Sequence, residues 1–120
     1  MKSSKSPLYK SFGYAFTGIL SALKSERNLV IHFVIMSLVI TFGFMFEISV
    51  LEWIICMIMF ALVISAELFN TAFEMLVDMT EPNVNKKAKF CKDVAAGTVL
   101  FNATIAFIVG LMIFIPYIFN

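Results

Sequence analysis

Three long apolar stretches, separated by short polar segments, account for most of the chain. They cover residues 29–46, 51–78 and 93–119, and each is close to or above the length of about 20 residues that a helix needs to cross a membrane. The segment 79–92 holds one proline, two asparagines and four lysines, which is typical of a loop. We predict an all-α integral membrane protein that forms a single domain with three transmembrane helices.

A fourth helix is predicted before the first span, in residues 7–26. At 100° per residue its apolar side chains fall on one face, and its lysines and hydroxyl groups fall on the opposite face. Pro7 suits the first turn of such a helix. We expect this helix to lie on the membrane surface, with an apolar face made of Leu8, Phe12, Ala15, Phe16, Ile19 and Leu23.

Composition agrees with a membrane location, and charge indicates an orientation. Of the 120 residues, 61% are hydrophobic and 14% are charged, whereas soluble domains are roughly half apolar and a quarter charged. All nine Lys and Arg residues lie before the first span or between the second and third spans. The positive-inside rule therefore predicts a cytoplasmic N-terminus and an external C-terminus. Cys56 and Cys91 show neither a disulfide framework nor a metal-binding spacing.

The second predicted span ends in a polar stripe. Successive intervals of three, four and four residues place four polar side chains on one helix face, namely Glu67, Asn70, Glu74 and Asp78. Asp78 would lie among the headgroups, and Glu67, about 16 Å deeper along the helix, would lie in lipid. A lone carboxylate there is costly unless it is paired, protonated or bound to a metal. Helix–helix hydrogen bonds and an ion pair with a loop lysine could account for one such residue, but less easily for four.

Other charged residues are predicted at a similar depth. Glu26 lies where the surface helix meets the first span, and Lys92 and Asp93 open the third span. Acids and a lysine at one depth indicate a divalent cation that carries phosphates, because Mg²⁺ is typically held by one or two carboxylates and by substrate oxygens. Glu67 could act as a general base on a lipid hydroxyl, since a carboxylate removed from water becomes a stronger base. Asn70 could hydrogen-bond this base or the reacting oxygen.

The same residues resemble a known family over nearly the whole chain. The stretch E-L-F-N-T-A-F-E-M-L-V-D, residues 67–78, is similar to the signature E-x-x-N-[ST]-A-x-E-x-x-V-D of the small prokaryotic membrane lipid kinases. K-D-V-A-A-G follows fourteen residues later, and G-Y-A-F-T-G-I and E-R-N-L-V-I-H near the start also match. The family includes diacylglycerol kinase and undecaprenol kinase, and the E-R-N-x-x-I-H stretch resembles the undecaprenol kinase branch.

The resemblance implies a role for each matching residue. Glu67 would be the proton acceptor, Asn70 would support it, and Asp78 would have a supporting role. Glu26 and Glu74 would hold Mg²⁺ and, through it, the co-substrate ATP. The other positions would contact the nucleotide, namely Tyr14, Asn83, Val84, Asn85, Lys92 and Asp93, or the lipid acceptor, namely Asn28 and His32. The resemblance also implies a homotrimer in the bacterial plasma membrane, with active sites between protomers.

Two positions depart from the diacylglycerol kinases of the Gram-negative type. His32 stands where those proteins have an acid, and Pro7 stands where they have an arginine that contacts the nucleotide. The first difference leaves both undecaprenol and diacylglycerol open as acceptors, and the second implies that one nucleotide contact is absent. His32 also has a simpler interpretation, because a histidine at the end of a span commonly reaches toward the headgroups.

Two other classes of protein fit part of the pattern. A small proton-coupled transporter could use Glu67 and Glu74 as a relay. Apart from Glu47 and Glu52, however, the ionisable groups gather at the cytoplasmic end, which disfavours a path across the membrane. A structural subunit would use its loop lysines to contact anionic headgroups.

The sequence has no phosphate-binding loop and no protein-kinase motif, so a nucleotide site would have to be built from helix ends. We expect a lipid kinase that phosphorylates undecaprenol, with diacylglycerol as the alternative acceptor.

Overall fold

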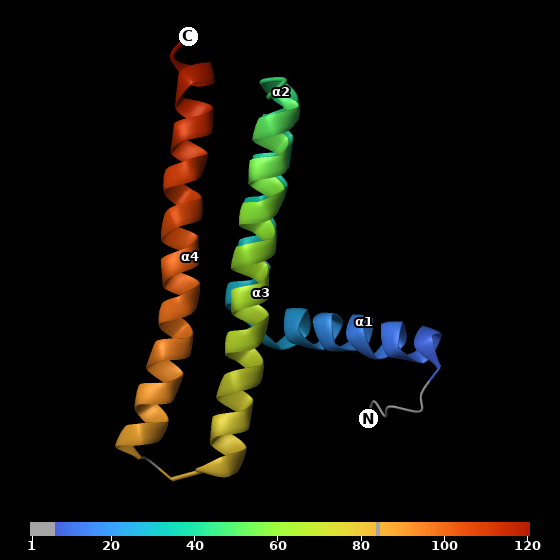
Figure 1. Cartoon of the computed structure of the whole chain (residues 1–120), viewed down its shortest axis with the longest axis vertical. Helices are drawn as coiled ribbons and strands as arrows, with labels where there is room; N and C mark the ends of the chain where they lie inside the picture. The colour runs from blue at the N-terminus through green and yellow to red at the C-terminus, as the bar shows by residue number, and fades with distance from the viewer. Residues whose placement is uncertain (1–6, 84) are drawn as a thin grey trace.

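Four helices make up the part of the chain that the structure describes, residues 7–83 and 85–120. In this computed structural model they are α1 (Leu8–Ser25), α2 (Arg27–Met45), α3 (Val50–Thr80) and α4 (Lys86–Ile118). The last three are each long and apolar enough to cross a membrane. They run alongside one another, whereas α1 projects from the bundle at a steep angle (Figure 1). The predicted all-α fold with three membrane-spanning helices is confirmed.

α3 and α4 are much longer than one membrane crossing. They contain 31 and 33 residues, which correspond to about 46 to 50 Å of helix, whereas the hydrocarbon core is roughly 30 Å thick. α2 has 19 residues and matches the core. α3 and α4 therefore extend past the start of α2, and this extension is the lower end of the bundle in Figure 1.

The start of α4 differs from the loop 79–92 that the sequence suggested. Asn85 caps the helix, because its side-chain Oδ1 accepts hydrogen bonds from the backbone amides of Lys87 at 2.8 Å and Ala88 at 3.3 Å. Asparagine is among the preferred residues at this position, since it satisfies amides that have no partner inside the helix. The helix therefore begins at Lys86 rather than at Asp93, and the lysine-rich segment is helical.

A single residue separates α1 from α2. Glu26 has extended backbone angles, with φ −114° and ψ 108°. Its amide donates to Ala22 O at 2.8 Å, and its carbonyl accepts from the Val30 amide at 3.4 Å. Glu26 therefore makes a terminal hydrogen bond of α1 and a first-turn hydrogen bond of α2. This break turns the chain from the direction of α1 into that of the bundle and places the Glu26 side chain at the corner.

The opposite end of the bundle is tightly connected. Glu47 has a positive φ of 51°, and Ser49 and Glu52 form a capping box that starts α3. α2 and α3 approach closely beside this turn, because a Cβ atom at Gly43 would lie 2.5 Å from the ring of Trp53. The carboxylate of Glu52 also accepts a hydrogen bond from the Tyr117 hydroxyl of α4. The ends of α3 and α4 are therefore joined here.

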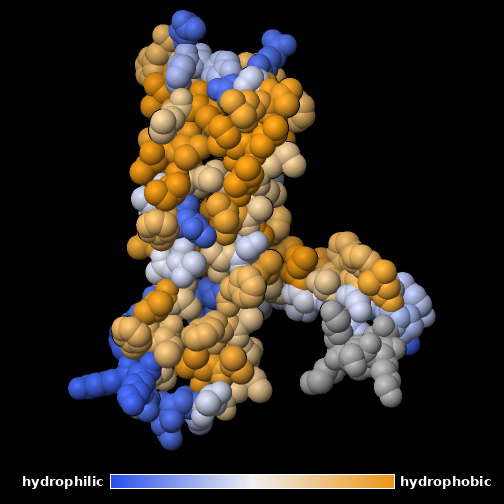
Figure 2. Space-filling model, in the orientation of Figure 1, coloured by the Kyte–Doolittle hydropathy of each residue, from blue (hydrophilic) through white to orange (hydrophobic). Residues whose placement is uncertain are grey.

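Most large apolar side chains point away from the bundle. Phe69 on α3 and Leu100 on α4, for example, are 77% and 70% exposed. Figure 2 shows a largely apolar surface along the upright helices and hydrophilic side chains at their two ends. A continuous apolar surface of this size favours association in water. Lipid tails are therefore the solvent that suits it, and the protein is a membrane protein.

Candidate active site

The polar stripe of α3 passes from the interior of the bundle to its surface. Glu67 is buried, with 3% of its surface exposed. Asn70 and Glu74 are half-buried, and Asp78 is exposed near the end of the helix. The stripe therefore connects one buried carboxylate with charged groups in the part of α3 that extends past α2.

The buried carboxylate of Glu67 lies against His32 of α2. The His32 Nε2 atom is 3.5 Å from Glu67 Oε2, and the two side chains are 19% and 4% exposed. This contact joins α2 to α3. Glu26 and Glu74 are the two other carboxylates whose charge influences Glu67.

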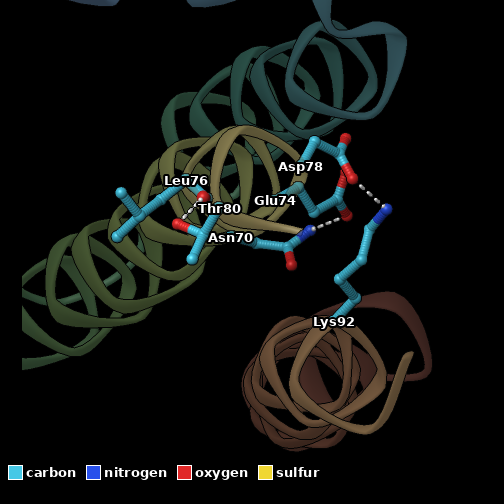
Figure 3. A network of polar contacts seen from close by, with 6 residues as sticks. All are labelled: Asn70, Glu74, Leu76, Asp78, Thr80 and Lys92. Carbon is cyan, nitrogen blue, oxygen red and sulfur yellow. Dashed lines mark hydrogen bonds and ion pairs between the residues drawn. The ribbon is translucent and has the colours of Figure 1, made fainter. Parts of the chain in front are cut away.

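Asn70 supports Glu74 rather than Glu67. Its side-chain Nδ2 donates a hydrogen bond of 3.1 Å to Glu74 Oε1, one turn further along α3 (Figure 3). We expected this amide beside the carboxylate of Glu67 or beside the reacting oxygen. Both carboxylates are neighbours of Asn70 on the helix, since residues three and four apart can interact, and the amide bonds the one four residues further on. Asn70 therefore fixes the orientation of the Glu74 carboxylate.

Lys92 and Asp93 point in different directions. Lys92 Nζ donates to Asp78 Oδ1 of α3 at 2.7 Å (Figure 3), and the Glu74 carboxylate also acts on this ammonium group. Asp93 instead pairs with Lys89 at 2.6 Å on the exposed side of α4. Consecutive residues on a helix are about 100° apart, so they cannot share one face. Within a single chain, the predicted convergence at this boundary includes Lys92 but not Asp93.

The remaining predicted site residues lie outside this group. Tyr14 on α1, Asn28 on α2 and Asn83 before α4 are exposed. Asn85 caps α4 through its side chain, which is a structural role that the sequence interpretation did not include. Val84 lies outside the described residues. Within one chain, the predicted site is therefore more complete around Glu67 and Glu74 than among the residues that were predicted to bind the nucleotide.

Glu74 and Asn70 carry the oxygen atoms that could serve a magnesium ion here. The hydrogen bond from Asn70 uses Oε1 of Glu74 and leaves Oε2 available. The buried Oδ1 atom of Asn70 has no hydrogen-bond partner in the described part of the chain. Within residues 7–83 and 85–120, no three His, Cys, Asp or Glu side chains form a complete metal site. This donor set fits a cation that one or two carboxylates hold together with substrate phosphates.

An apolar groove of about 760 Å³ begins at His32. Its walls come from α2 and α4 and its floor from α3, and it extends along α2 as far as Phe46. These fourteen residues correspond to about 21 Å of helix, or roughly two thirds of a hydrocarbon core. Among the described residues, its lining is aliphatic, aromatic or sulfur-containing except at His32. A single polar group therefore marks one end, directly beside Glu67.

Sequence reasoning did not identify this groove or the contact between His32 and Glu67. It also did not single out Asn102, whose side-chain Nδ2 donates to the Leu62 carbonyl of α3 at 3.2 Å. One signal was available, because an amide in the middle of an apolar span usually has a partner on a neighbouring helix. The groove had no comparable signal, since it depends on how far α2 and α4 stand apart.

Known proteins are similar to this chain over the region that contains these residues. The sequence profile of the prokaryotic diacylglycerol kinase family matches residues 13–114. Undecaprenol kinase of Bacillus subtilis (strain 168) is 40% identical over 108 residues, which are 90% of this chain and 88% of that protein. Diacylglycerol kinase of Synechocystis sp. is 36% identical over 110 residues, which are 91% of this chain and 63% of that protein. The matched region includes every residue from Tyr14 to Asp93 discussed above.

Proposed function

The chain belongs to the prokaryotic diacylglycerol kinase family, and from this premise we propose that it transfers the γ-phosphate of ATP to the hydroxyl group of a membrane lipid, with undecaprenol as the main acceptor. The observation that carries the proposal is the position of Glu67, which is buried at the polar end of a long apolar groove. A lipid tail in the groove would bring its hydroxyl group to this carboxylate.

The residues around Glu67 suit the separate parts of the reaction. Glu67 would accept the hydroxyl proton as the oxygen attacks phosphorus, which is general base catalysis. Lys92 would approach the phosphate groups of ATP, because its ammonium lies beside Glu74 at the end of α3 that extends past α2. Phosphoryl transfer depends mainly on such positioning and on neutralising charge. Tyr14, Asn83, Asn85 and Asp93 would complete the nucleotide contacts.

Glu74 and Glu26 would hold Mg²⁺, the metal that we propose for the site. When bound, this ion neutralises phosphate charge and orients the transferred group. Asn70 would hold the Glu74 carboxylate ready for it, since the amide already fixes one of the two carboxylate oxygens. The unpartnered Asn70 Oδ1 could hydrogen-bond a water molecule on the ion.

Undecaprenol is favoured over diacylglycerol for two reasons. The undecaprenol kinase of B. subtilis matches this chain at 40% identity and over 88% of its own length. The groove is long and almost entirely apolar, which suits a hydrocarbon chain without ester groups. Diacylglycerol is the alternative acceptor, because the Synechocystis diacylglycerol kinase is also similar at 36% identity.

We also infer a homotrimer with active sites between protomers. Within one chain, Asp93 pairs with Lys89 on an exposed face, and Tyr14 is exposed on α1. A second copy could bring such residues to Glu67. The test is to co-assemble two inactive variants, Glu67→Gln and Asp93→Asn. Activity in the mixture supports shared sites, and an inactive mixture contradicts them.

The distribution of charge supports an orientation in the bacterial plasma membrane. Among the described residues, the Lys and Arg side chains lie on α1, at the start of α2 or in the first turns of α4. We therefore place the N-terminus and residues 81–85 in the cytoplasm, where ATP is present, and the C-terminus outside.

The function is tested with purified full-length protein in detergent, γ-labelled ATP, and either undecaprenol or diacylglycerol. We expect labelled lipid with both alcohols and a higher kcat/KM with undecaprenol. Glu67→Gln should lower kcat by about a hundredfold or more, whereas Glu47→Gln at the opposite end of the bundle should resemble wild type. Wild-type protein that labels neither lipid would refute the proposal. Proton-driven uptake into vesicles without ATP would indicate a transporter instead.

A further inference from the structure

We propose that His32 is the proton exit of the active site. It would take from Glu67 the proton that the acceptor hydroxyl loses, and it would release that proton to water. The inference rests on the proposed kinase function and deepens it, because it assigns the path of the proton and gives His32 a role other than contact with the lipid.

The buried position of Glu67 creates the need for such an exit. In each turnover the acceptor O–H bond breaks, an O–P bond forms, and the bond between the γ-phosphorus and its bridging oxygen breaks to release ADP. The hydroxyl proton goes to Glu67, whose side chain is 4% exposed. A carboxyl group that keeps this proton cannot deprotonate the next acceptor. The proton must therefore leave through a neighbouring group.

His32 is positioned to be that group. Its Nε2 atom lies 3.5 Å from Glu67 Oε2, and its side chain is 19% exposed, so it connects the buried carboxylate with more accessible surroundings. It also lies at the end of the groove where the acceptor hydroxyl would arrive. Histidine suits the role because its two ring nitrogens allow a proton to enter at one atom and leave at the other.

The other charged groups near Glu67 have different partners. Glu26 at the start of α2 and Glu74 on α3 act on Glu67, but in the proposed site they hold the cation. On α4, Lys92 pairs with Asp78 at 2.7 Å, and Lys89 pairs with Asp93. Among the ion pairs of the described residues, His32 is therefore the partner of Glu67 that has no other charged partner.

The proton balance fixes the order of events. Before the reaction Glu67 is a carboxylate and His32 carries its proton on Nδ1, so that Nε2 faces Oε2 with a free lone pair. Glu67 accepts the hydroxyl proton as the O–P bond forms and passes it from Oε2 to Nε2. His32 then releases the Nδ1 proton to water, and proton exchange with water returns the ring to the Nδ1–H tautomer. Glu67 is again a carboxylate, and one proton has passed to solvent.

Two variants of His32 test this path. Glutamine at position 32 keeps a hydrogen-bonding group but cannot carry a proton, so His32→Gln should lower kcat by about a hundredfold with little change in the KM of either substrate. His32→Ala should lose activity and regain much of it when free imidazole is added, with a rescue that follows the concentration of imidazole. Ser37→Ala is the matched control on α2, because its hydroxyl bonds only the Phe33 carbonyl of the same helix.

Three results would overturn the proposal. The first is a kcat for His32→Gln equal to that of wild type. The second is a defect confined to the KM of the lipid, which would mean that His32 only contacts the acceptor. The third is a lack of rescue of His32→Ala by imidazole. Failure of the proposed kinase function is a separate result, because wild-type protein would then phosphorylate no lipid and both proposals would fall.

Discussion

The side-chain amide of Asn102 on α4 donates a hydrogen bond of 3.2 Å to the backbone carbonyl of Leu62 on α3. Two further polar contacts join the same helices nearer their ends, Lys92 with Asp78 and Tyr117 with Glu52. These outer contacts are 26 residues apart along α3 and 25 residues apart along α4. Three polar contacts at three depths thus hold the two helices in one register, and this register sets the height of Glu67 relative to Lys92.

Removal of the middle contact should weaken the pair of helices measurably. We expect Asn102→Ala to lower the free energy of unfolding by about 0.6 kcal/mol, the average for hydrogen bonds between membrane helices, and by no more than about 1.7 kcal/mol. Thr104→Ala is the control, because its hydroxyl donates to the Leu100 carbonyl within α4. Denaturant unfolding in micelles, followed by circular dichroism, measures both variants. If the two variants lose equal free energy of unfolding, the hydrogen bond between the helices contributes no more than one within a helix.

Lys92 should affect nucleotide binding more than stability. Its ion pair with Asp78 is partly exposed, at 37% and 61% of the two side chains, and exposed pairs contribute at most about 1 kcal/mol. Lys92→Gln should raise the KM for ATP by about tenfold or more, since a hydrogen bond to a charged group contributes about 1.5 to 3 kcal/mol. Asp78→Asn should leave the free energy of unfolding nearly unchanged.

A charge exchange separates these two roles of Lys92. The double variant Asp78→Lys with Lys92→Asp restores an ion pair between α3 and α4 but moves the positive charge to α3. We expect its KM for ATP to stay high in steady-state assays with γ-labelled ATP. Recovery of the wild-type KM would mean that Lys92 serves mainly to join the helices.

Much of the fold was predictable because its causes are local. The length of each apolar stretch sets where α2, α3 and α4 cross the membrane, and the break before α2 coincides with Glu26, which was predicted at that junction. The start of α4 was less predictable. The lysines of residues 86–92 suggested a loop, whereas one side-chain cap at Asn85 is enough to make them helical. Charge predicts which side of the membrane a segment occupies, but it does not decide whether that segment is helical.

The site was predictable along one helix and less so between helices. Glu67, Asn70, Glu74 and Asp78 all lie on the single helix α3, so their spacing puts them on one stripe. Which neighbour each one meets depends on how α2 and α4 are rotated about α3, and the sequence does not state this rotation. That is why the contact between Glu67 and His32, and the separation of Lys92 from Asp93, came from the structure.

Glu74 should determine how the enzyme depends on magnesium. Its carboxylate is oriented by Asn70 through a hydrogen bond of 3.1 Å. Glu74→Gln removes the charge that would attract the ion, so we expect the magnesium concentration for half-maximal activity to rise by about tenfold or more, with partial recovery at high magnesium. Activity measured against magnesium at fixed ATP tests this. Glu81→Gln, just after α3, is the control, and a wild-type magnesium curve for Glu74→Gln would contradict the assignment.

Gly110 provides a direct test of what occupies the groove. A Cβ atom built at Gly110 meets no other atom within 4 Å, and this residue lines the groove of about 760 Å³. Gly110→Phe adds a ring at a position that lines the groove, and its Cβ has open space around it. If the groove holds the lipid tail, kcat/KM for undecaprenol should fall while the KM for ATP and the thermal stability stay close to wild type.

The control for the groove is Ile105→Phe, which adds a ring to α4 at a position that is 41% exposed and outside the groove lining. Unchanged lipid kinetics for Gly110→Phe would show that the acceptor binds elsewhere. A change in the number of subunits, measured by size-exclusion chromatography with light scattering, would instead show that a helix of a neighbouring copy fills the groove. The lipid assay and the subunit count therefore distinguish a lipid tail from a neighbouring protein helix as the occupant of this groove.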